Sequence, residues 1–145
     1  MKITIIHGAN LNLLGTREPS IYGNESLEQI NHSIADCFPT IEFIFFQSNI
    51  EGELINKIQE ASNTSDAIII NPGGYSHTSV AIADAIAAIK IPTVEVHLSN
   101  LFARESFRHT SITGSKCLGT ISGFGKYSYI LGIEAIIKHL TKENG

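Results

Sequence analysis

Five short apolar runs recur along the chain and predict β-strands. They are KITIIH (2–7), IEFIFFQ (41–47), DAIIIN (66–71), IPTVEVH (91–97) and KCLGTIS (116–122). The runs are rich in β-branched residues and have few polar interruptions. Strands of this composition are typical of a parallel sheet that is covered on both faces.

Apolar residues at helical spacing lie between these runs and predict four helices. The first two carry Leu27, Ile30 and Ile34 and then Leu54, Ile55, Ile58 and Ala61; the third is expected from Thr78 to Ile89, and the fourth from about Tyr127 to Leu140. Ser26 with Gln29, and Ser48 with Glu51, have the spacing of a capping box, in which two side chains satisfy backbone N–H groups at a helix start.

Strands that alternate with helices imply a parallel sheet with right-handed crossovers. Five strands and about four helices predict an α/β fold with a flavodoxin-like, doubly wound five-stranded parallel sheet, and residues 1–145 are expected to form a single domain. The third helix, TSVAIADAIAAI, is apolar nearly all round, which indicates burial on more than one side. Two interpretations stay open: a subunit interface, or a central helix that is simply rich in alanine.

Composition and charge narrow the class of protein. The chain is 43% hydrophobic and 17% charged, as expected of a globular protein rather than a disordered one. Its net charge of −4 argues against nonspecific nucleic-acid binding, which needs a basic surface. No apolar run approaches the roughly 20 residues that span a bilayer, and the N-terminus lacks the apolar region of a signal peptide. We therefore expect a cytoplasmic protein that binds neither nucleic acid nor a membrane.

The cysteines and histidines give little support to a metal site. Cys37 and Cys117 form no CxxC motif, and both are expected to be buried thiols. The six histidines include no HxH or HxxxH pair, the spacings at which two imidazoles commonly share a metal. No metal and no cofactor is predicted.

The segment HGANLNLLGTREPSIYG, from His7 to Gly23, matches neither a helix nor a strand. Structureless loops longer than about 12–15 residues are uncommon in compact domains and are usually lids, binding loops or disordered segments. This one carries the polar residues Asn10, Asn12, Arg17, Glu18 and Tyr22. We expect a lid loop over about residues 8–24.

Polar side chains follow three of the predicted strands, where open α/β sheets bind their ligands. They are Asn10, Asn12, Arg17 and Tyr22 after the first run, Asn71, Ser76, His77 and Thr78 after the third, and Glu95, His97, Ser99, Arg104 and Arg108 at and after the fourth. Glu95 and His97 are two apart on a strand and so face the same way, and a carboxylate can orient an imidazole for acid–base chemistry. A phenol such as Tyr22 is a poor base unless nearby cations favour the phenolate, and the arginines could supply them. The groups favour proton abstraction or elimination on an acidic substrate.

The stretch from Asn71 to Thr78 has two expected roles. Asn71-Pro72-Gly73-Gly74 has the composition of a turn, and its glycines allow a ligand to approach the backbone. His77 and Thr78 are expected to open the third helix, where backbone N–H groups and the dipole favour a carboxylate.

Two further motifs are incomplete and leave two weaker alternatives. GFGKYS (123–128) has Ser128 where GxGxxG has its third glycine, which speaks against a flavin- or nucleotide-binding module. GYSHT (74–78) ends in Thr78 where a GxSxG nucleophile elbow has glycine, which speaks against an esterase that uses Ser76.

Four segments together resemble type II 3-dehydroquinate dehydratase (type II dehydroquinase): HGANLNLLGTREPSIYG, NPGGYSHTSVAIADA, VEVHLSN and ARESFRHTS. The resemblance covers the whole chain, in order and spacing. It implies a hydro-lyase without metal or organic cofactor that converts 3-dehydroquinate to 3-dehydroshikimate and water, by anti elimination through an enolate. It also implies a homo-oligomer, a dodecamer of four trimers. The reaction serves the shikimate pathway of aromatic amino acid biosynthesis or quinate catabolism, and both contexts stay open.

The resemblance implies a role for each matching residue. The catalytic residues are Tyr22 as the base at C2, Arg17 on the lid, Arg104 as the cation that holds the phenolate, Asn10 near the enolate oxygen, and His97 as the acid, oriented by Glu95. The substrate-binding residues are Asn71, Leu98 and Ser99 at the carboxylate, His77 and Arg108 at the ring hydroxyls, and Asp84 at a neighbouring subunit's site. Ala9 replaces the proline of the family's usual GPNLN turn, so a slightly more flexible turn is expected.

Overall fold

The five apolar runs form one parallel sheet in the computed structural model, which describes residues 1–144. Its strands are β1 (Lys2–His7), β2 (Glu42–Gln47), β3 (Ala67–Asn71), β4 (Thr93–His97) and β5 (Gly119–Ser122). Their spatial order is β2-β1-β3-β4-β5, and every neighbouring pair is parallel. This is the flavodoxin-like order, in which the chain reverses direction across the sheet between β1 and β3 and opens a crevice at the carboxyl ends of the strands. The predicted fold class is confirmed.

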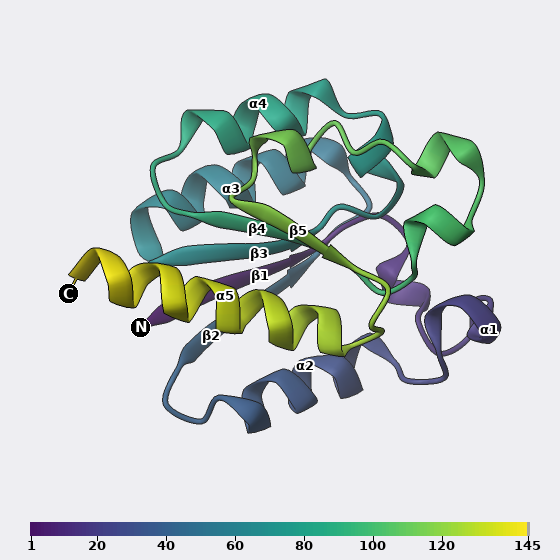
Figure 1. The fold of residues 1–145 in the computed structure, drawn as a ribbon, viewed down its shortest axis with the longest axis horizontal. Helices are drawn as coiled ribbons and strands as arrows, with labels where there is room; N and C mark the ends of the chain where they lie inside the picture. The colour runs from purple at the N-terminus through teal and green to yellow at the C-terminus, as the bar shows by residue number, and fades with distance from the viewer. Residues whose placement is uncertain (145) are drawn as a thin grey trace.

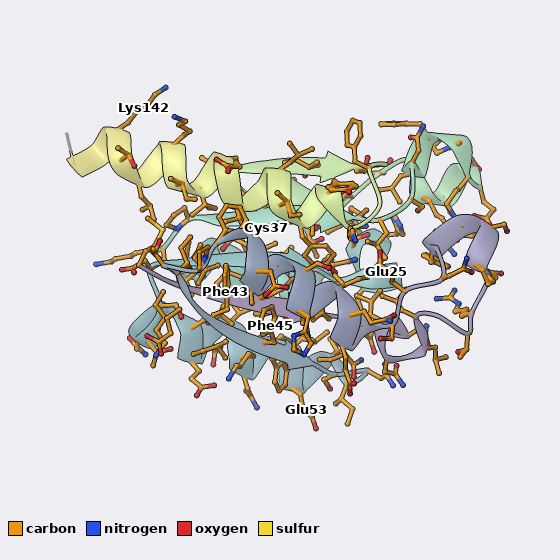
Figure 2. All side chains as sticks on the ribbon, turned by 90° about the horizontal axis from the view of Figure 1, so that it is seen from below. Glu25, Cys37, Phe43, Phe45, Glu53 and Lys142 are labelled. Carbon is orange, nitrogen blue, oxygen red and sulfur yellow. The ribbon has the colours of Figure 1, made fainter. Side chains whose placement is uncertain are left out.

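Two helices cover each face of the sheet (Figure 1). On one face lie α2 (Leu27–Cys37) and α5 (Tyr127–Asn144), and on the other lie α3 (Glu51–Thr64) and α4 (Val80–Ala88). Both faces bury aliphatic side chains because successive strand residues point to opposite sides: Ile5 packs under α2 and α5, and Ile6 packs under α3. The edge strand β2 adds Phe43 and Phe45, whose rings stack at 5.6 Å between centroids and lie side by side in Figure 2.

One of the two predicted capping boxes exists. At the start of α2, Ser26 Oγ accepts from the backbone N–H of Gln29 at 3.2 Å, and Gln29 Oε1 accepts from the N–H of Ser26 at 2.8 Å. The box predicted for Ser48 with Glu51 is wrong. Helix α3 begins only at Glu51, so the Ser48 hydroxyl accepts from Ile50 N–H at 3.0 Å in the preceding turn.

The third helix starts later than predicted. Residues Gly73–His77 form the 3-10 helix η2, and α4 then begins at Val80 with Ser79 as its N-cap, accepting from Ile82 N–H at 2.9 Å. His77 and Thr78 therefore precede α4 rather than open it. In the single chain α4 is buried on one side and exposed on the other, so the predicted burial on more than one side is not present without a partner.

The expected lid loop contains two short helices, which the sequence analysis missed. They are the 3-10 helix η1 (Leu11–Leu13) and the helix α1 (Pro19–Tyr22). Leu11 and Leu14 are buried in the core and anchor the first part of the segment. The second part projects past the carboxyl end of the sheet, where α1 stands apart from the layered body (Figure 1).

The prediction that both cysteines are buried thiols is wrong for Cys37. Cys37 is exposed at the end of α2, and Cys117 is half-buried; both are unpaired. Burial and the nearby Glu95 carboxylate raise the pKa of the Cys117 thiol to about 12, so this thiol is unreactive at neutral pH. Over residues 1–144 no helix has both the length and the apolar character needed to span a membrane.

Candidate active site

The loops after β1, β3 and β4 enclose one pocket at the carboxyl edge of the sheet, as predicted. Its lining consists of Ala9, Asn10, Leu11, Arg17, Tyr22, Asn71, Gly73, Gly74, His77, His97, Leu98, Ser99, Leu101, Arg104 and Arg108. All predicted site residues are among them except Glu95, which lies behind His97, and Asp84. Three arginines and no carboxylate line the pocket, so its charge favours an anionic ligand.

Glu95 and His97 form a buried pair. Nε2 of His97 lies 2.9 Å from Oε2 of Glu95, and the two residues are only 4% and 0% exposed. The hydroxyl of Ser111 donates to the same carboxylate at 2.6 Å, and that of Thr113 donates to its other oxygen. Burial acts to raise the pKa of Glu95, but the hydrogen bonds and charge of His97 and the two hydroxyls outweigh it and lower the pKa. The carboxylate therefore stays ionised, and it leaves Nδ1 of His97 free to act in the pocket.

Gly114 is required for this arrangement. A Cβ atom at Gly114 would lie 2.9 Å from Oε2 of Glu95 and 2.9 Å from Oγ of Ser111. These distances are shorter than side-chain contacts allow. A side chain at this position would therefore displace the carboxylate or its hydroxyl donor.

Tyr22 lies against two guanidinium groups. The Cζ atoms of Arg17 and Arg104 are 4.8 Å and 5.1 Å from the centre of its ring. Nη1 of Arg104 also donates to Oγ of Ser99 at 3.2 Å, which holds that guanidinium at the rim of the pocket. The ring of Tyr22 therefore lies between two positively charged groups.

Asn71 ends β3 with both ends of its amide hydrogen-bonded. Its Oδ1 accepts from the backbone N–H of Gly73 at 3.1 Å, and its Nδ2 donates to the hydroxyl of Tyr129 at 3.2 Å. Nδ2 carries two hydrogens, so one N–H remains for the pocket. Tyr129 was not predicted, because the helical spacing of its neighbours marks it only as a core position.

His77 and Arg108 also line the pocket. Nδ1 of His77 donates to the carbonyl of Thr110 at 2.8 Å, and its ring lies 6.3 Å from that of His97, nearly parallel. Nε of Arg108 donates to Glu105 at 2.8 Å, and its terminal nitrogens remain for a ligand. Two polar side chains with free nitrogens can bind the hydroxyl groups of a substrate.

Asn10 adopts a left-handed backbone conformation, with φ of 70°, that few residues other than glycine and asparagine adopt. Its backbone N–H donates to Oδ1 of Asn49 at 2.8 Å, and Nε2 of Gln47 donates to the same oxygen at 3.1 Å. The sequence analysis missed Asn49 because it considered no residue after β2. That position at the carboxyl end of a strand was the available signal.

The turns after β1 and β3 pack backbone to backbone. A Cβ at Gly8 would lie 2.3 Å from the carbonyl oxygen of Pro72, and one at Gly73 would lie 2.7 Å from that of Ala9. These glycines therefore bring two loops together, in addition to any approach of a ligand. Gly8 N–H donates to Asn71 O at 2.7 Å, which further restrains the turn that contains Ala9.

The remaining predicted groups lie elsewhere. Asp84 is exposed on α4, outside this pocket, and Asn12 and Thr78 are also exposed. Ser76 is fully buried, does not line the pocket and has no hydrogen-bond partner for its hydroxyl, so the esterase alternative lacks an accessible nucleophile.

Gly123 packs against Asn100, and Gly125 N–H donates to Leu98 O, so the GFGKYS segment forms a tight structural turn. Among residues 1–144 no three His, Cys, Asp or Glu side chains gather as a metal cluster would.

The fold and the pocket define the class of the protein: a small α/β enzyme with acid–base groups arranged around an anionic substrate. The family described as Dehydroquinase class II matches residues 1–137, and the chain belongs to this family. The family resemblance drawn from the four sequence segments is therefore confirmed.

Known proteins resemble this chain over nearly its whole length, in sequence and in structure. It is 54% identical to a 3-dehydroquinate dehydratase of Clostridium botulinum (Langeland strain), over 98% of this chain and 95% of that protein. It is 49% identical to a 3-dehydroquinate dehydratase of Aliarcobacter butzleri, over 98% of this chain and 88% of that protein. The crystal structure of a type II dehydroquinase from Butyrivibrio crossotus superposes with a TM-score of 0.91 at 48% identity, covering 94% of this chain and 97% of that one.

Proposed function

We propose that the pocket binds 3-dehydroquinate and eliminates water from it with Tyr22 as base and His97 as acid. The activity follows from the family: the chain is a hydro-lyase of the 3-dehydroquinate dehydratase type, whose usual context is the shikimate pathway. One observation carries the assignment of roles. The pocket places a tyrosine beside two guanidinium groups together with a histidine bound to a buried carboxylate.

The first step is removal of a proton from C2, next to the ketone. Tyr22 takes this proton as a phenolate, which Arg17 and Arg104 stabilise. The negative charge then moves onto the ketone oxygen as an enolate. Asn10, at the rim of the pocket, holds a water against that oxygen, and such a donor is most effective where charge develops in the transition state.

The second step is loss of the hydroxyl at C1. His97 protonates the departing oxygen through Nδ1, because Nε2 is bound to Glu95. The ionised Glu95 holds the imidazole at Nε2 and so orients Nδ1 toward the departing hydroxyl. After each turnover Tyr22 releases the C2 proton to water and His97 takes up one proton from water, so both groups regain their starting forms.

Substrate binding uses the other lining residues. Asn71 and Ser99, with backbone N–H groups at Leu98 and Ser99, hold the substrate carboxylate. His77 and Arg108, which also line the pocket, hold the ring hydroxyls. These contacts fix the C2 hydrogen toward Tyr22 and the C1 hydroxyl toward His97, the arrangement that an anti elimination requires.

The segment from Gly15 to Gly23 acts as the lid that carries Tyr22. Both glycines have positive φ, 92° and 87°, and these conformations let the chain turn sharply at either end of the segment. An ion pair of 3.0 Å between Lys126 and Glu25 fixes the chain just beyond the second glycine. Closure of the lid would exclude water and bring the base to the substrate.

We also propose that the protein assembles as a dodecamer of four trimers. The exposed side of α4 is apolar apart from Asp84, and Val80 on this side is 60% exposed. Asp84 would then reach the site of a neighbouring subunit. Light scattering should give about twelve times the subunit mass of 15.7 kDa, and a monomer would contradict the assembly. The unpaired, exposed Cys37 is compatible with the reducing cytoplasm, where we place the enzyme.

The test of the proposed chemistry is direct. Protein treated with a chelator is mixed with 3-dehydroquinate, and the ultraviolet absorbance of the conjugated enone carboxylate is followed. A rise that borohydride pretreatment leaves unchanged supports elimination through an enolate without a Schiff base. A rise that His97→Ala and Tyr22→Phe leave at the rate of the unmodified protein would contradict the assigned roles.

A further inference from the structure

A hydrogen-bonded network of four side chains, three of them buried, runs from Asn71 in the pocket to Asn31 on α2. Nδ2 of Asn71 lies 3.2 Å from the hydroxyl of Tyr129, and that hydroxyl lies 2.9 Å from Nδ1 of His7. Nε2 of His7 lies 2.8 Å from Oδ1 of Asn31. The residues come from β3, α5, β1 and α2, and His7 and Tyr129 are fully buried.

Two acceptor oxygens set the directions of these hydrogen bonds: Oδ1 of Asn71 at one end and Oδ1 of Asn31 at the other. A backbone N–H can only donate, so Gly73 N–H requires Oδ1 of Asn71 as its acceptor, and this orients the amide. Nδ2 of Asn71 must then donate to the Tyr129 oxygen. The single hydroxyl hydrogen of Tyr129 is left for Nδ1 of His7, and the hydrogen on Nε2 of His7 goes to Asn31.

The two titratable members keep these directions at neutral pH. Burial lowers the pKa of His7 to about 4, so its ring is neutral and Nδ1 can accept. Burial also raises the pKa of Tyr129 well above its usual value, so the hydroxyl keeps its hydrogen. The hydrogen bonds therefore keep their directions at neutral pH, and neither His7 nor Tyr129 gains or loses a proton there.

We propose that Tyr129 is a positioning residue of the dehydratase, which together with His7 fixes the Asn71 amide so that its second N–H points at the substrate carboxylate. The proposal rests on the role given to Asn71 under the proposed function. An amide held at both its oxygen and its nitrogen cannot rotate about its last side-chain bond. Tyr129 does not line the pocket, so it acts only through Asn71.

The test is a double-mutant cycle that pairs Tyr129→Phe with Asn71→Ala. The substrate carboxylate is charged both before and during elimination, so its contact with Asn71 contributes equally to ground state and transition state. Tyr129→Phe should therefore raise KM for 3-dehydroquinate roughly tenfold, the effect of one lost charge-assisted hydrogen bond, with kcat little changed. Tyr127→Phe, the same change at an exposed position of the same helix, is the matched control and should leave KM unaltered.

The cycle separates positioning from a merely structural role. If Tyr129 acts through Asn71, Tyr129→Phe raises KM in the natural background and has no further effect once Asn71 is alanine. An equal increase in both backgrounds, or a loss confined to kcat, would overturn the proposal while leaving the proposed function intact. An unchanged KM in Asn71→Ala alone would overturn both the carboxylate role of Asn71 and the positioning role of Tyr129.

A second variant covers the case in which Tyr129→Phe does not fold. Asn31→Leu removes only the last acceptor of the network, at a half-buried position on α2. His7, Tyr129 and Asn71 lie between this position and the substrate. The histidine can then present a hydrogen to Tyr129 and disturb the fixed directions. KM should rise about two- to threefold through the weakened positioning of Asn71. A KM equal to that of the unmodified enzyme would overturn the proposal.

Discussion

Nε2 of His97 lies 2.9 Å from Oε2 of Glu95, and neither side chain has appreciable contact with solvent. The carboxylate has three donors around it: His97, Ser111 and Thr113. Because the donors compensate the burial of the charge, His97 has a fixed anion on one side and the pocket on the other.

Glu95→Gln should lower kcat by roughly 10- to 100-fold, the range found when the residue that orients a functional histidine is replaced. Glutamine keeps the shape of the side chain but removes the negative charge that faces Nε2 of His97. Steady-state kinetics with 3-dehydroquinate measure the effect. Glu60→Gln, an exposed residue of α3, is the control. A kcat within twofold of the natural enzyme would show that the Glu95 charge is not needed.

Gly114→Ala should also lower kcat, by about tenfold, although Gly114 does not touch the pocket. The added Cβ would displace Oε2 of Glu95 or the Ser111 hydroxyl, each at 2.9 Å, and a misplaced catalytic group costs rate. Gly52→Ala in α3 is the matched control, because no atom lies within 4 Å of its added Cβ. Both variants are compared by kcat and by thermal melting. Equal kinetics in the two would contradict the close packing around Glu95.

Tyr22→Phe should fold normally and lose turnover by about 10³-fold or more, because phenylalanine cannot accept the C2 proton. The residue is half-exposed at the end of α1, so loss of its hydroxyl leaves the core unchanged. Calorimetric titration with 3-dehydroquinate should still detect binding by the variant. Turnover near that of the natural enzyme would remove Tyr22 as the base.

Gly23→Ala should slow the closure of the lid. At φ of 87° an alanine is strained, although no neighbouring atom would contact its Cβ. The effect therefore comes from the backbone alone and should reduce kcat severalfold with the core unaffected. Gly52→Ala again serves as the control. Stopped-flow measurement of substrate binding would report the slower closure, and an unchanged binding rate would argue against a hinge at Gly23.

The fold was predictable because its signals are local and repeated. The runs that become β1 and β3 are apolar on both faces, which requires helices on both sides and so a parallel sheet. Glu95 and His97 were also predictable as a pair, since residues two apart on a strand must face the same way. The helix start near Ser48 was not, because Ser48 and Glu51 have the spacing of a capping box although α3 begins only at Glu51, with Ile50 as its N-cap.

The residues that the sequence did not reveal act through distant partners. Tyr129 is 58 positions from Asn71 and 122 from His7, and no local pattern distinguishes its hydroxyl from an ordinary core tyrosine. Ser111 and Thr113 likewise approach Glu95 from a segment without regular spacing. Cys37 was predicted to be buried because free cysteines usually are, but its place at the end of α2 leaves it in solvent.

His7 should make the free energy of unfolding depend on pH in the acid range. Its pKa is about 4 in the folded protein and about 6.5 in the unfolded chain, so the unfolded chain binds the extra proton first as the pH falls. The stabilisation is complete above about pH 6.5, is lost progressively down to about pH 4, and amounts to about 3 kcal/mol. Urea unfolding curves between pH 7 and pH 4 measure it, and His7→Gln should flatten the dependence by up to about 1.4 kcal/mol per pH unit. His32→Gln, at an exposed position of α2, is the control and should leave the pH dependence of the free energy of unfolding unchanged. If His7→Gln kept the full slope, carboxylates and not His7 would govern the acid sensitivity of the fold.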